Sequence, residues 1–338
     1  MTKSVCVTGG ASFIGSHLTE KLVDYNYEVQ VIDDLSSGKK EFLEGCKDKI
    51  QFHHFDIRRD TKRLHDIFKE CDTVFHLANI HGGRNFIHYH PALCCNNMAI
   101  DNLVFETAVN AGVKHTQFCS SACVYPLSYQ AKNGYEFLKE EFVDYENLRS
   151  ADEEYGLAKL MGEVSLRAHK REFGINGSIV RLSSIYGPRE NETHAVVALI
   201  AKAFVRQDPY EIFGDGTQLR NFTYVDDVVE CMIRASKKIN DCTPVNLGTE
   251  EFISINDLVE LIFNHFKWRP SKINHDLSKP TGAHSRIVSN KRTSELLDFH
   301  KEDWTPIEIG VKKTIDWYIV THDKNRVSQQ LEILLKER

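Results

Sequence analysis

The chain has 338 residues, and its 41% hydrophobic and 27% charged content is typical of a globular protein rather than a disordered one. Its formal net charge of −6 offers no basic field to nucleic acid or an anionic membrane, and no apolar run reaches the roughly 18 residues of a membrane span. The nine cysteines lack a CxxC pair or a regular spacing, which argues against a metal site or a disulfide framework and favours a reducing, cytoplasmic compartment.

The first half of the chain alternates short apolar runs with segments of helical periodicity. The pattern predicts strands at 5–8, 29–33, 50–55, 73–78, 116–120 and 177–182, and helices at 14–24, 98–111 and 155–173. Because such alternation is typical of parallel sheets, residues 1–182 are predicted to form a Rossmann-type, doubly wound α/β domain. The alternation weakens after about residue 183, so we expect 183–338 to be mainly a smaller mixed α/β lobe that binds substrate, with some chain crossing back to the sheet.

A glycine-rich turn, Gly9-Gly10-Ala11-Ser12-Phe13-Ile14-Gly15, links the first strand to the first helix. Glycines at such a turn let the backbone approach a pyrophosphate, which the helix N-terminus also attracts. Asp33 ends the second strand 18 residues after Gly15, about where an acid binds the adenosine ribose of a dinucleotide. A carboxylate there would repel a 2′-phosphate and therefore favours NAD over NADP. Asp56, after the third strand, suits the adenine amine; the alternative is an ordinary turn followed by solvated acids.

Tyr155 and Lys159 have the spacing YxxxK on a predicted helix, which places them on one face, one turn apart. A nearby ammonium favours the phenolate, so Tyr155 is a candidate base for a sugar hydroxyl whose carbon loses a hydride. Ser121 and Cys123 follow the strand at 116–120. Ser121 can hydrogen-bond the same hydroxyl, and a thiol, with an ordinary pKa of about 8.5, can move protons between carbon and solvent. A plain amphipathic helix and a buried cysteine are the alternatives.

The combination of the glycine turn, Ser121, the YxxxK pair and the segment RLSSIYGP at 181–188 resembles the extended short-chain dehydrogenase/reductase family of nucleotide-sugar enzymes. Within it, the segment from Gly82-Gly83 to Ser121-Ala122-Cys123 is most similar to the GDP-mannose 3,5-epimerases, with features of the GDP-fucose synthases. Ordinary 4,6-dehydratases of this family have Asp-Glu where this chain has Ala122-Cys123. The resemblance implies bound NAD, a nucleotide-diphosphate sugar as substrate, and a homodimer built on the helices at 98–111 and 155–173.

The resemblance also assigns roles to single residues. Cys123 occupies the position of the proton-carrying cysteine of both groups. The epimerases have a lysine after the YGP segment as second proton carrier, but this chain has none before Lys202, so His194 inherits that role by its likeness to the histidine of the GDP-fucose synthases. The alternative is a surface or core histidine without a catalytic role. Cofactor contacts are implied for Gly9, Gly10, Ser12, Phe13, Ile14, Gly15, Asp33, Asp56, Ile57, Leu77, Tyr155 and Lys159. Substrate contacts are implied for Gly83, Arg84, Ser184, Arg220 and Arg286. Ser184 stands where the family usually has asparagine, and Ser289 where it has aspartate, so the sugar and the nucleotide stay open.

Together these residues predict an NAD-dependent nucleotide-sugar epimerase that acts through a transient 4-keto sugar at carbon 5, carbon 3 or both. Alternatives within the family are a nucleotide-sugar dehydratase of the 4,6- or 5,6-type and a 4-keto-sugar epimerase/reductase, although Asp33 disfavours the NADPH that a reductase consumes. A more distant alternative is an inactive NAD-binding regulatory protein, against which Tyr155 and Lys159 argue.

Overall fold

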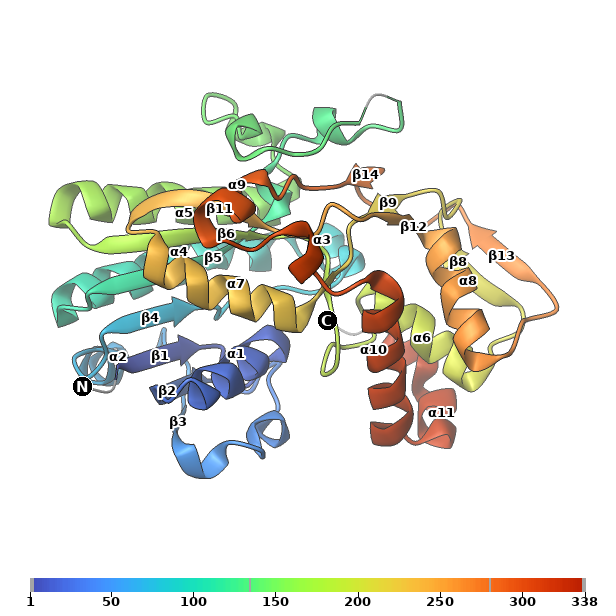
Figure 1. Cartoon of the computed structure of the whole chain (residues 1–338), viewed down its shortest axis with the longest axis horizontal. Helices are drawn as coiled ribbons and strands as arrows, with labels where there is room; N and C mark the ends of the chain where they lie inside the picture. The colour runs from blue at the N-terminus through green and yellow to red at the C-terminus, as the bar shows by residue number, and fades with distance from the viewer. Residues whose placement is uncertain (1–2, 134, 280, 336–338) are drawn as a thin grey trace.

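One parallel sheet of seven strands forms the larger part of the molecule, on the left of Figure 1. The structure, a computed structural model, describes residues 3–133, 135–279 and 281–335. The strands lie in the order β3-β2-β1-β4-β5-β6-β11, and each neighbouring pair is parallel. Their bounds are β1 Ser4–Thr8, β2 Glu28–Asp33, β3 Ile50–His54, β4 Thr73–His76, β5 His115–Ser121, β6 Asn176–Leu182 and β11 Asp241–Leu247.

Side chains of each strand alternate between two buried faces of this sheet. In β1, Val5 and Val7 belong to the core on one face, whereas Cys6 belongs to the core on the other. Because both faces are covered, the strands appear in the sequence as short continuous apolar runs rather than as polar-apolar alternation.

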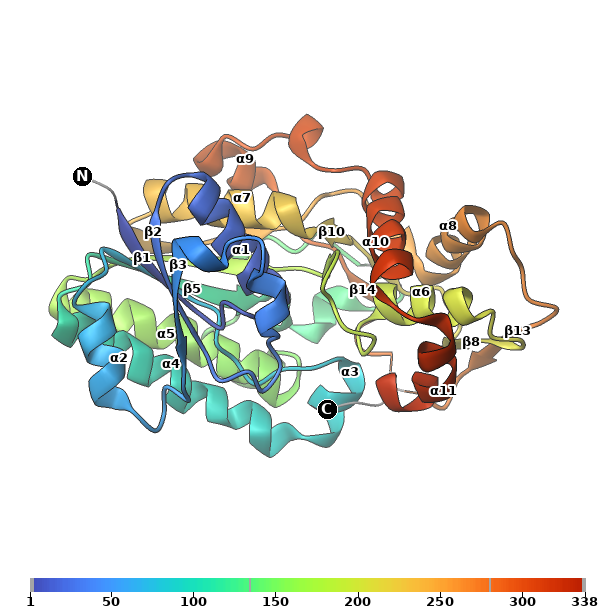
Figure 2. The same ribbon diagram turned by 90° about the horizontal axis from the view of Figure 1, so that it is seen from below.

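Helices cover both faces, as Figure 2 shows with the sheet between two layers. One face packs against α1 (Phe13–Asp24), α7 (Val225–Lys238) and α9 (Lys291–Leu297). The other packs against α2 (Thr61–Phe68), α4 (Pro91–Ala111) and α5 (Glu153–Phe173). The predicted Rossmann-type, doubly wound sheet is therefore confirmed.

The ends of the predicted elements shift by one or two residues in the structure, except at the helix predicted at 98–111, which differs more. The strand predicted at 73–78 ends at His76, and the helix predicted at 98–111 begins seven residues earlier, at Pro91. Proline is favourable in a first helical turn because no intrahelical partner exists there for the N–H that it lacks.

A smaller mixed lobe lies beyond the carboxyl edge of the sheet, on the right of Figures 1 and 2. Its separate core is built from α6 (Ala195–Val205), α8 (Ile255–Phe266), α10 (Ile307–Thr321) and α11 (Lys324–Leu334). Short strand groups complete it: β8 (Tyr210–Phe213) with β13 (Ile273–Asp276), β7 (Ile185–Tyr186) with β10 (Thr223–Tyr224), and β9 (Leu219–Arg220) between β12 (Ile253–Ser254) and β14 (Ser285–Arg286).

Residues after 183 contribute to both parts of the molecule. β11 adds an edge strand to the sheet, while α7 and α9 cover one of its faces. The last three residues of the range 183–338 lie outside the described part of the chain. The two lobes are thus not separated at a single chain position, because the second half returns to the sheet between its excursions into the smaller lobe.

All nine cysteines are free thiols. Among the described residues, no group of three or more His, Cys, Asp or Glu side chains could hold a metal ion. Within the same ranges, every helix is too short or too polar to cross a membrane.

Candidate active site

The order of the strands reverses between β1 and β4, which are neighbours in the sheet. Such a switch point opens a crevice at the carboxyl ends of the strands, where doubly wound folds bind their ligands. The turn at 9–15 follows β1, and Leu77 follows β4, so the two segments form the sides of this crevice.

At Gly9 and Gly15, the glycine turn has no room for a side chain. Gly9 has φ +73°, in the left-handed region, and a Cβ there would lie 2.9 Å from the Ala78 nitrogen. A Cβ on Gly15 would lie 2.1 Å from the Gly9 carbonyl oxygen, so α1 can approach the turn only with glycine at this place. Ser12, which stands where the middle glycine is usual, fits because its hydroxyl donates to the Gly9 oxygen at 2.5 Å.

The start of α1 offers N–H groups to an anion. Ser12 is the N-cap residue, and its side chain makes no capping hydrogen bond to the helix. The first N–H groups of a helix have no intrahelical acceptor, and they carry the positive end of the helix dipole. The turn and helix start therefore leave N–H groups that a pyrophosphate could accept, and binding of the dinucleotide by these residues stays a prediction.

The two predicted adenosine ligands occupy different environments. The Asp33 carboxylate is buried and accepts N–H groups from Ala11 at 2.9 Å and Leu35 at 2.8 Å. Burial raises the pKa of Asp33, and these two hydrogen bonds oppose the rise. The Asp56 carboxylate instead forms a two-pronged ion pair with Arg58, at 2.9 and 2.8 Å, which lowers its pKa. Its neighbour Ile57 is buried. Adenosine binding by these residues stays a prediction.

Calorimetric titration of cofactor-free protein is expected to show binding of NAD at least about tenfold tighter than binding of NADP, a difference of ~1.4 kcal/mol. The reason is that the 2′-phosphate would lie beside the Asp33 carboxylate, and like charges repel. Asp33→Asn should reduce this difference between the affinities for NAD and NADP, whereas Asp34→Asn, at the exposed neighbouring position, should leave it unchanged. Equal binding of the two cofactors by the unaltered protein would remove Asp33 as the discriminating residue.

A cavity of about 450 Å³ lies between the sheet edge and the smaller lobe. Most of the predicted site residues line it: Ser12, Phe13, Ile14, Leu77, Gly83, Arg84, Ser121, Cys123, Tyr155, Lys159, Ser184, His194, Arg220 and Arg286. Six others do not line it and belong to the glycine turn, the Asp33 environment and the segment after β3: Gly9, Gly10, Gly15, Asp33, Asp56 and Ile57. The structure thus brings residues from distant parts of the chain to one space.

Tyr155 and Lys159 lie in the first two turns of α5. The Lys159 ammonium is buried, donates to the Cys119 carbonyl oxygen at 2.8 Å and lies 4.9 Å from the centre of the Phe118 ring. Burial lowers the pKa of Lys159, against the attraction of the Asp101 carboxylate. Burial also raises the pKa of Tyr155. The chain by itself therefore favours the protonated phenol, and a further positive charge beside Tyr155 is needed to favour the phenolate.

Cys123 sits at the end of β5, in the short helical turn Ala122–Val124. The Ser121 hydroxyl oxygen accepts the Cys123 N–H at 3.1 Å and so orders this turn. A Cβ on Gly156 would lie 2.2 Å from the Cys123 carbonyl oxygen, which shows how closely α5 approaches the turn. The Cys123 sulfur is a hydrogen-bond partner of Arg286 Nη1 at 3.1 Å.

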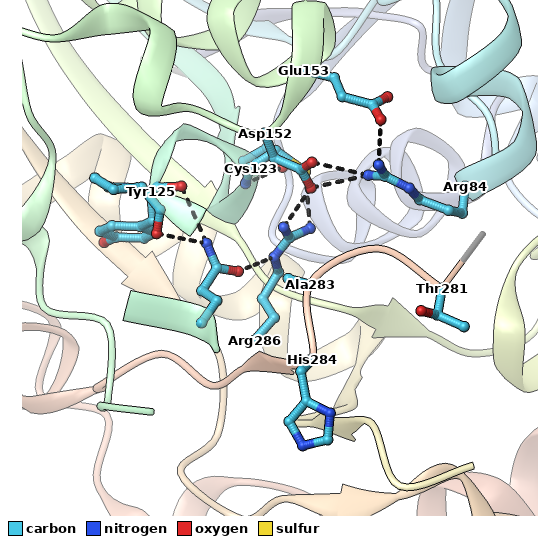
Figure 3. A network of polar contacts seen from close by, with 12 residues as sticks. Arg84, Cys123, Tyr125, Asp152, Glu153, Thr281, Ala283, His284 and Arg286 are labelled. Carbon is cyan, nitrogen blue, oxygen red and sulfur yellow. Dashed lines mark hydrogen bonds and ion pairs between the residues drawn. The ribbon is translucent and has the colours of Figure 1, made fainter. Parts of the chain in front are cut away.

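Asp152 joins two predicted substrate arginines, as Figure 3 shows. Both of its oxygens accept from Arg84 Nη1, at 3.0 and 3.1 Å, and Oδ2 also accepts from Arg286 Nη2. Arg84 further pairs with Glu153, and Arg286 Nε donates to the Gln130 side chain at 2.9 Å. Burial alone would raise the pKa of Asp152, but Arg286 and Arg84 outweigh it and lower that pKa. The two guanidinium groups are therefore held in place at the cavity wall.

Arg286→Ala is expected to weaken nucleotide-sugar binding by about 1.5–3 kcal/mol, the usual contribution of a hydrogen bond to a charged group. The Kd can be measured by calorimetry with UDP-, GDP- and dTDP-sugars. Arg269→Ala is the matched control, because Arg269 is an exposed arginine paired with Glu260 outside the cavity. An unchanged Kd in Arg286→Ala would place this arginine outside the phosphate site.

Arg220 lines the cavity, but backbone carbonyls hold its guanidinium. Nη1 donates to Leu219 at 2.7 Å and His284 at 3.1 Å, and Nη2 to Ala283 at 2.8 Å and Thr281 at 3.3 Å. Burial, and then the neighbouring Arg286, lower its pKa. Arg220 therefore orders the 281–284 loop that leads to Arg286. A direct contact of Arg220 with substrate stays a prediction.

The segment after β7 forms another wall of the cavity. His194 is the N-cap residue of α6, and its Nδ1 lies 3.7 Å from Glu190 Oε1. A Cβ on Gly83 would lie 2.1 Å from the Thr193 carbonyl oxygen, so this glycine permits close packing of α3 (Arg84–Tyr89) on the segment. Ser184, also at the wall, has φ +43°, which is uncommon without glycine.

Sequence reasoning missed three polar residues of the site: Asp152, Gln130 and Glu190. Asp152 is three residues before Tyr155, yet its partners Arg84 and Arg286 are 68 and 134 residues away in the chain. Gln130 is 156 residues from Arg286. No local pattern marks such pairs. Only Glu190 has a local signal, because it comes two residues after the recognised segment RLSSIYGP at 181–188.

Comparisons with known proteins agree with this geometry. Residues 5–248 match the model of the NAD dependent epimerase/dehydratase family. GDP-mannose 3,5-epimerase of Arabidopsis thaliana is 31% identical over 321 residues, which cover 93% of this chain and 81% of that protein.

Two solved structures share the fold. UDP-glucose 4-epimerase of Thermotoga maritima, with UDP-glucose, has a TM-score of 0.81 at 28% identity and covers 94% of this chain and 99% of its own. UDP-glucuronic acid 4-epimerase of Bacillus cereus, with UDP-glucuronic acid and NAD, has a TM-score of 0.83 at 25% identity, with 94% and 100% covered. The predicted enzyme class and the predicted cofactor, NAD, are confirmed. The chain belongs to the NAD dependent epimerase/dehydratase family.

Proposed function

We propose that this chain is a nucleotide-sugar epimerase that works through a transient 4-keto sugar and inverts carbon 5, carbon 3 or both. The observation that carries the proposal is that Cys123 lines the same cavity as Tyr155 and Lys159. A Tyr–Lys pair serves many hydride transfers, whereas a thiol beside it adds a group that can move a proton to and from carbon. The likeness to a GDP-mannose 3,5-epimerase supports this choice among the reactions of the family.

The proposed substrate is a nucleotide-diphosphate sugar. The solved relatives contain UDP-glucose or UDP-glucuronic acid. In this chain, Arg84 and Arg286 lie at the cavity wall with their charges ordered by Asp152. Guanidinium groups bind phosphate oxygens through charge-assisted hydrogen bonds, so these two arginines are the proposed pyrophosphate ligands.

The first chemical step is proton removal at the 4-hydroxyl. The glycine turn and the start of α1 would hold NAD, which would supply a reversible hydride acceptor for carbon 4. Tyr155 takes the hydroxyl proton, Ser121 positions the same hydroxyl, and Lys159 provides a positive charge one helical turn away. Because burial raises the pKa of Tyr155, we expect this step to become faster as the pH rises toward that pKa.

The second step inverts a carbon centre. A ketone at carbon 4 acidifies the hydrogens on carbons 3 and 5. One of Cys123 and His194 takes such a proton: the C–H bond breaks, an S–H or N–H bond forms, and the electron pair moves into an enolate. The other residue donates a proton on the opposite face, which forms the new C–H bond and restores the ketone.

The proposed assembly is a homodimer in the cytoplasm. α4 and α5 pack against each other along one face of the sheet and are the proposed dimer helices. Light scattering of the purified protein is the direct measurement of its oligomeric state.

The proposed function is tested by solvent exchange. The enzyme is incubated in deuterated water with UDP-, GDP- or dTDP-sugars and no added NADPH, and the recovered sugar is analysed by NMR. Deuterium at carbon 5 or carbon 3 is expected, because the proton returned to carbon comes from a group that exchanges with solvent. The labelled position identifies the acidified centre.

Other outcomes identify other reactions of the family. Inversion at carbon 4 without deuterium would mark a 4-epimerase, and loss of water a dehydratase. Absence of exchange with every nucleotide-sugar that binds would refute the epimerase proposal at carbons 3 and 5.

A further inference from the structure

A carboxyl group that the sequence did not point to, Glu190, lies beside the predicted proton carrier His194 at the wall of the cavity. Glu190 and His194 belong to the segment between β7 and α6, and both line the cavity. Glu190 Oε1 and His194 Nδ1 are 3.7 Å apart, with side-chain exposures of 4% for the glutamate and 32% for the histidine. Catalytic hydrogen bonds are often longer without ligands than in the working complex, so a small rotamer shift would join the two groups.

The Glu190 carboxyl has few neighbouring groups that would stabilise a negative charge on it. Its Oε2 is buried and has no hydrogen-bond partner among the described residues. Glu192, two residues later, differs: its Oε1 accepts the Tyr318 hydroxyl at 2.9 Å. An ionised carboxylate buried without partners is costly, and burial raises the pKa of Glu190 well above its usual range. Burial and the unpartnered Oε2 therefore both favour the protonated Glu190 carboxyl over the carboxylate.

The segment that carries the pair is anchored on two sides. Arg189 donates to the Ser16 hydroxyl at 3.1 Å and to Glu20 at 2.8 Å, both on α1. On the other side, the Thr193 carbonyl packs against Gly83 at the start of α3. The pair is therefore fixed next to the start of α1, where the cofactor is proposed to bind, rather than on a free loop.

We infer that Glu190 supplies the proton that His194 delivers to the substrate carbon. This inference rests on the proposed function and assigns its second proton carrier. In the step, the His194 Nε2–H bond breaks as the new C–H bond forms, and the Glu190 O–H bond breaks as an Nδ1–H bond forms. The enolate electron pair makes the C–H bond, the ketone is restored, and the negative charge ends on the Glu190 carboxylate. Solvent later returns a proton to that carboxylate.

This transfer of a proton from Glu190 through His194 is called the relay below. It gives a role to the buried acid beside the partly exposed histidine. The imidazole is neutral before and after the step and only changes tautomer, so no isolated imidazolium has to exist in the cavity. Glu190 touches neither the substrate nor the cofactor in this scheme. It is a positioning residue that acts through His194.

Two measurements test the inference on NAD-loaded enzyme. The first is the infrared C=O stretch of a protonated carboxyl at neutral pH, which an ionised carboxylate lacks. The difference spectrum of unaltered protein minus Glu190→Gln should contain this band.

The second measurement is deuterium entry into the sugar. Glu190→Gln keeps the size of the side chain but has no proton to give at this pH, so exchange should fall at least about tenfold, within the range known for general acids and bases. The substrate KM and the transient absorbance of reduced nicotinamide should stay close to those of the unaltered enzyme. His194→Gln should lower the exchange at least as much.

Each result has a defined consequence. Absence of the infrared band would show an ionised Glu190 and overturn the relay, whatever reaction the enzyme performs. Normal exchange in Glu190→Gln, with exchange present in the unaltered enzyme, would overturn the relay and leave the proposed function intact. No exchange in the unaltered enzyme would overturn both.

Discussion

Tyr155→Phe is expected to lower turnover by about 10²- to 10⁴-fold, the usual contribution of a positioned general base. Phenylalanine keeps the ring but removes the only group that the proposed mechanism gives for taking the 4-hydroxyl proton. Without that proton transfer, the hydride cannot leave carbon 4. Stopped-flow measurement should therefore show no transient reduction of the nicotinamide, while calorimetry should show NAD binding close to that of the unaltered protein.

Tyr25→Phe is the matched control for this substitution. Tyr25 lies just after α1, and its hydroxyl donates to Glu230 outside the cavity. Loss of that hydroxyl should leave turnover unchanged. If Tyr155→Phe kept more than about a tenth of the turnover, another group would have to be the base, because that loss lies below the range for general-base catalysis.

Cys123→Ala is expected to lower deuterium entry at carbon 5 or carbon 3 by about 10²- to 10⁴-fold, since one of the two proton carriers is lost. The transient reduction of the nicotinamide should persist, because oxidation at carbon 4 precedes the proton step and does not use the thiol. This separation of the two signals distinguishes a proton carrier from a residue that only supports the fold.

Two further variants sharpen the result for Cys123. Cys123→Ser keeps a small polar group beside Arg286, but a hydroxyl is a far weaker acid than a thiol, so exchange should stay low. Cys95→Ala removes another free thiol, on α4 and outside the cavity, and should leave exchange unchanged. Exchange that survives in Cys123→Ala and disappears only in His194→Ala would leave the histidine as the sole proton carrier.

The stability of Tyr155→Phe and of Cys123→Ala must be checked, because both side chains lie at the turn after β5. Cys123 is 7% exposed, and Tyr155 lies beside the turn that α5 approaches at Gly156. Thermal unfolding with and without NAD shows whether a lost signal reflects chemistry or a weakened fold. A ligand at 100 times its Kd should stabilise an intact site by about 2.7 kcal/mol.

The residues that could be predicted from the sequence share one property: their pattern is local. The glycine turn requires close backbone approach within seven residues, as the 2.1 Å distance from a Gly15 Cβ to the Gly9 oxygen shows. Tyr155 and Lys159 share one helix face because they are one turn apart. The alternation of apolar runs with helical segments is also a local pattern, because each strand and each helix buries its own apolar side. This alternation predicted the doubly wound sheet.

Other features depend on packing between distant segments. The sequence showed Arg84, Arg220 and Arg286 as three similar arginines, but the structure gives them different partners. Arg84 and Arg286 share Asp152, whereas backbone carbonyls of the 281–284 loop surround Arg220. An ion pair between residues 68 or 134 positions apart leaves no periodic trace in the sequence.

The amino-acid sequence by itself determined the fold class, the dinucleotide turn, the Tyr–Lys pair and the family, because these follow from spacing along one or two neighbouring elements. Only the tertiary structure decided that β11 is the strand that returns to the sheet, that Asp152 orders two arginines and that Glu190 is buried beside His194. The physical reason is that burial and electrostatic pairing depend on which side chains the folded chain brings within a few ångströms, and water covers these same groups in an isolated segment.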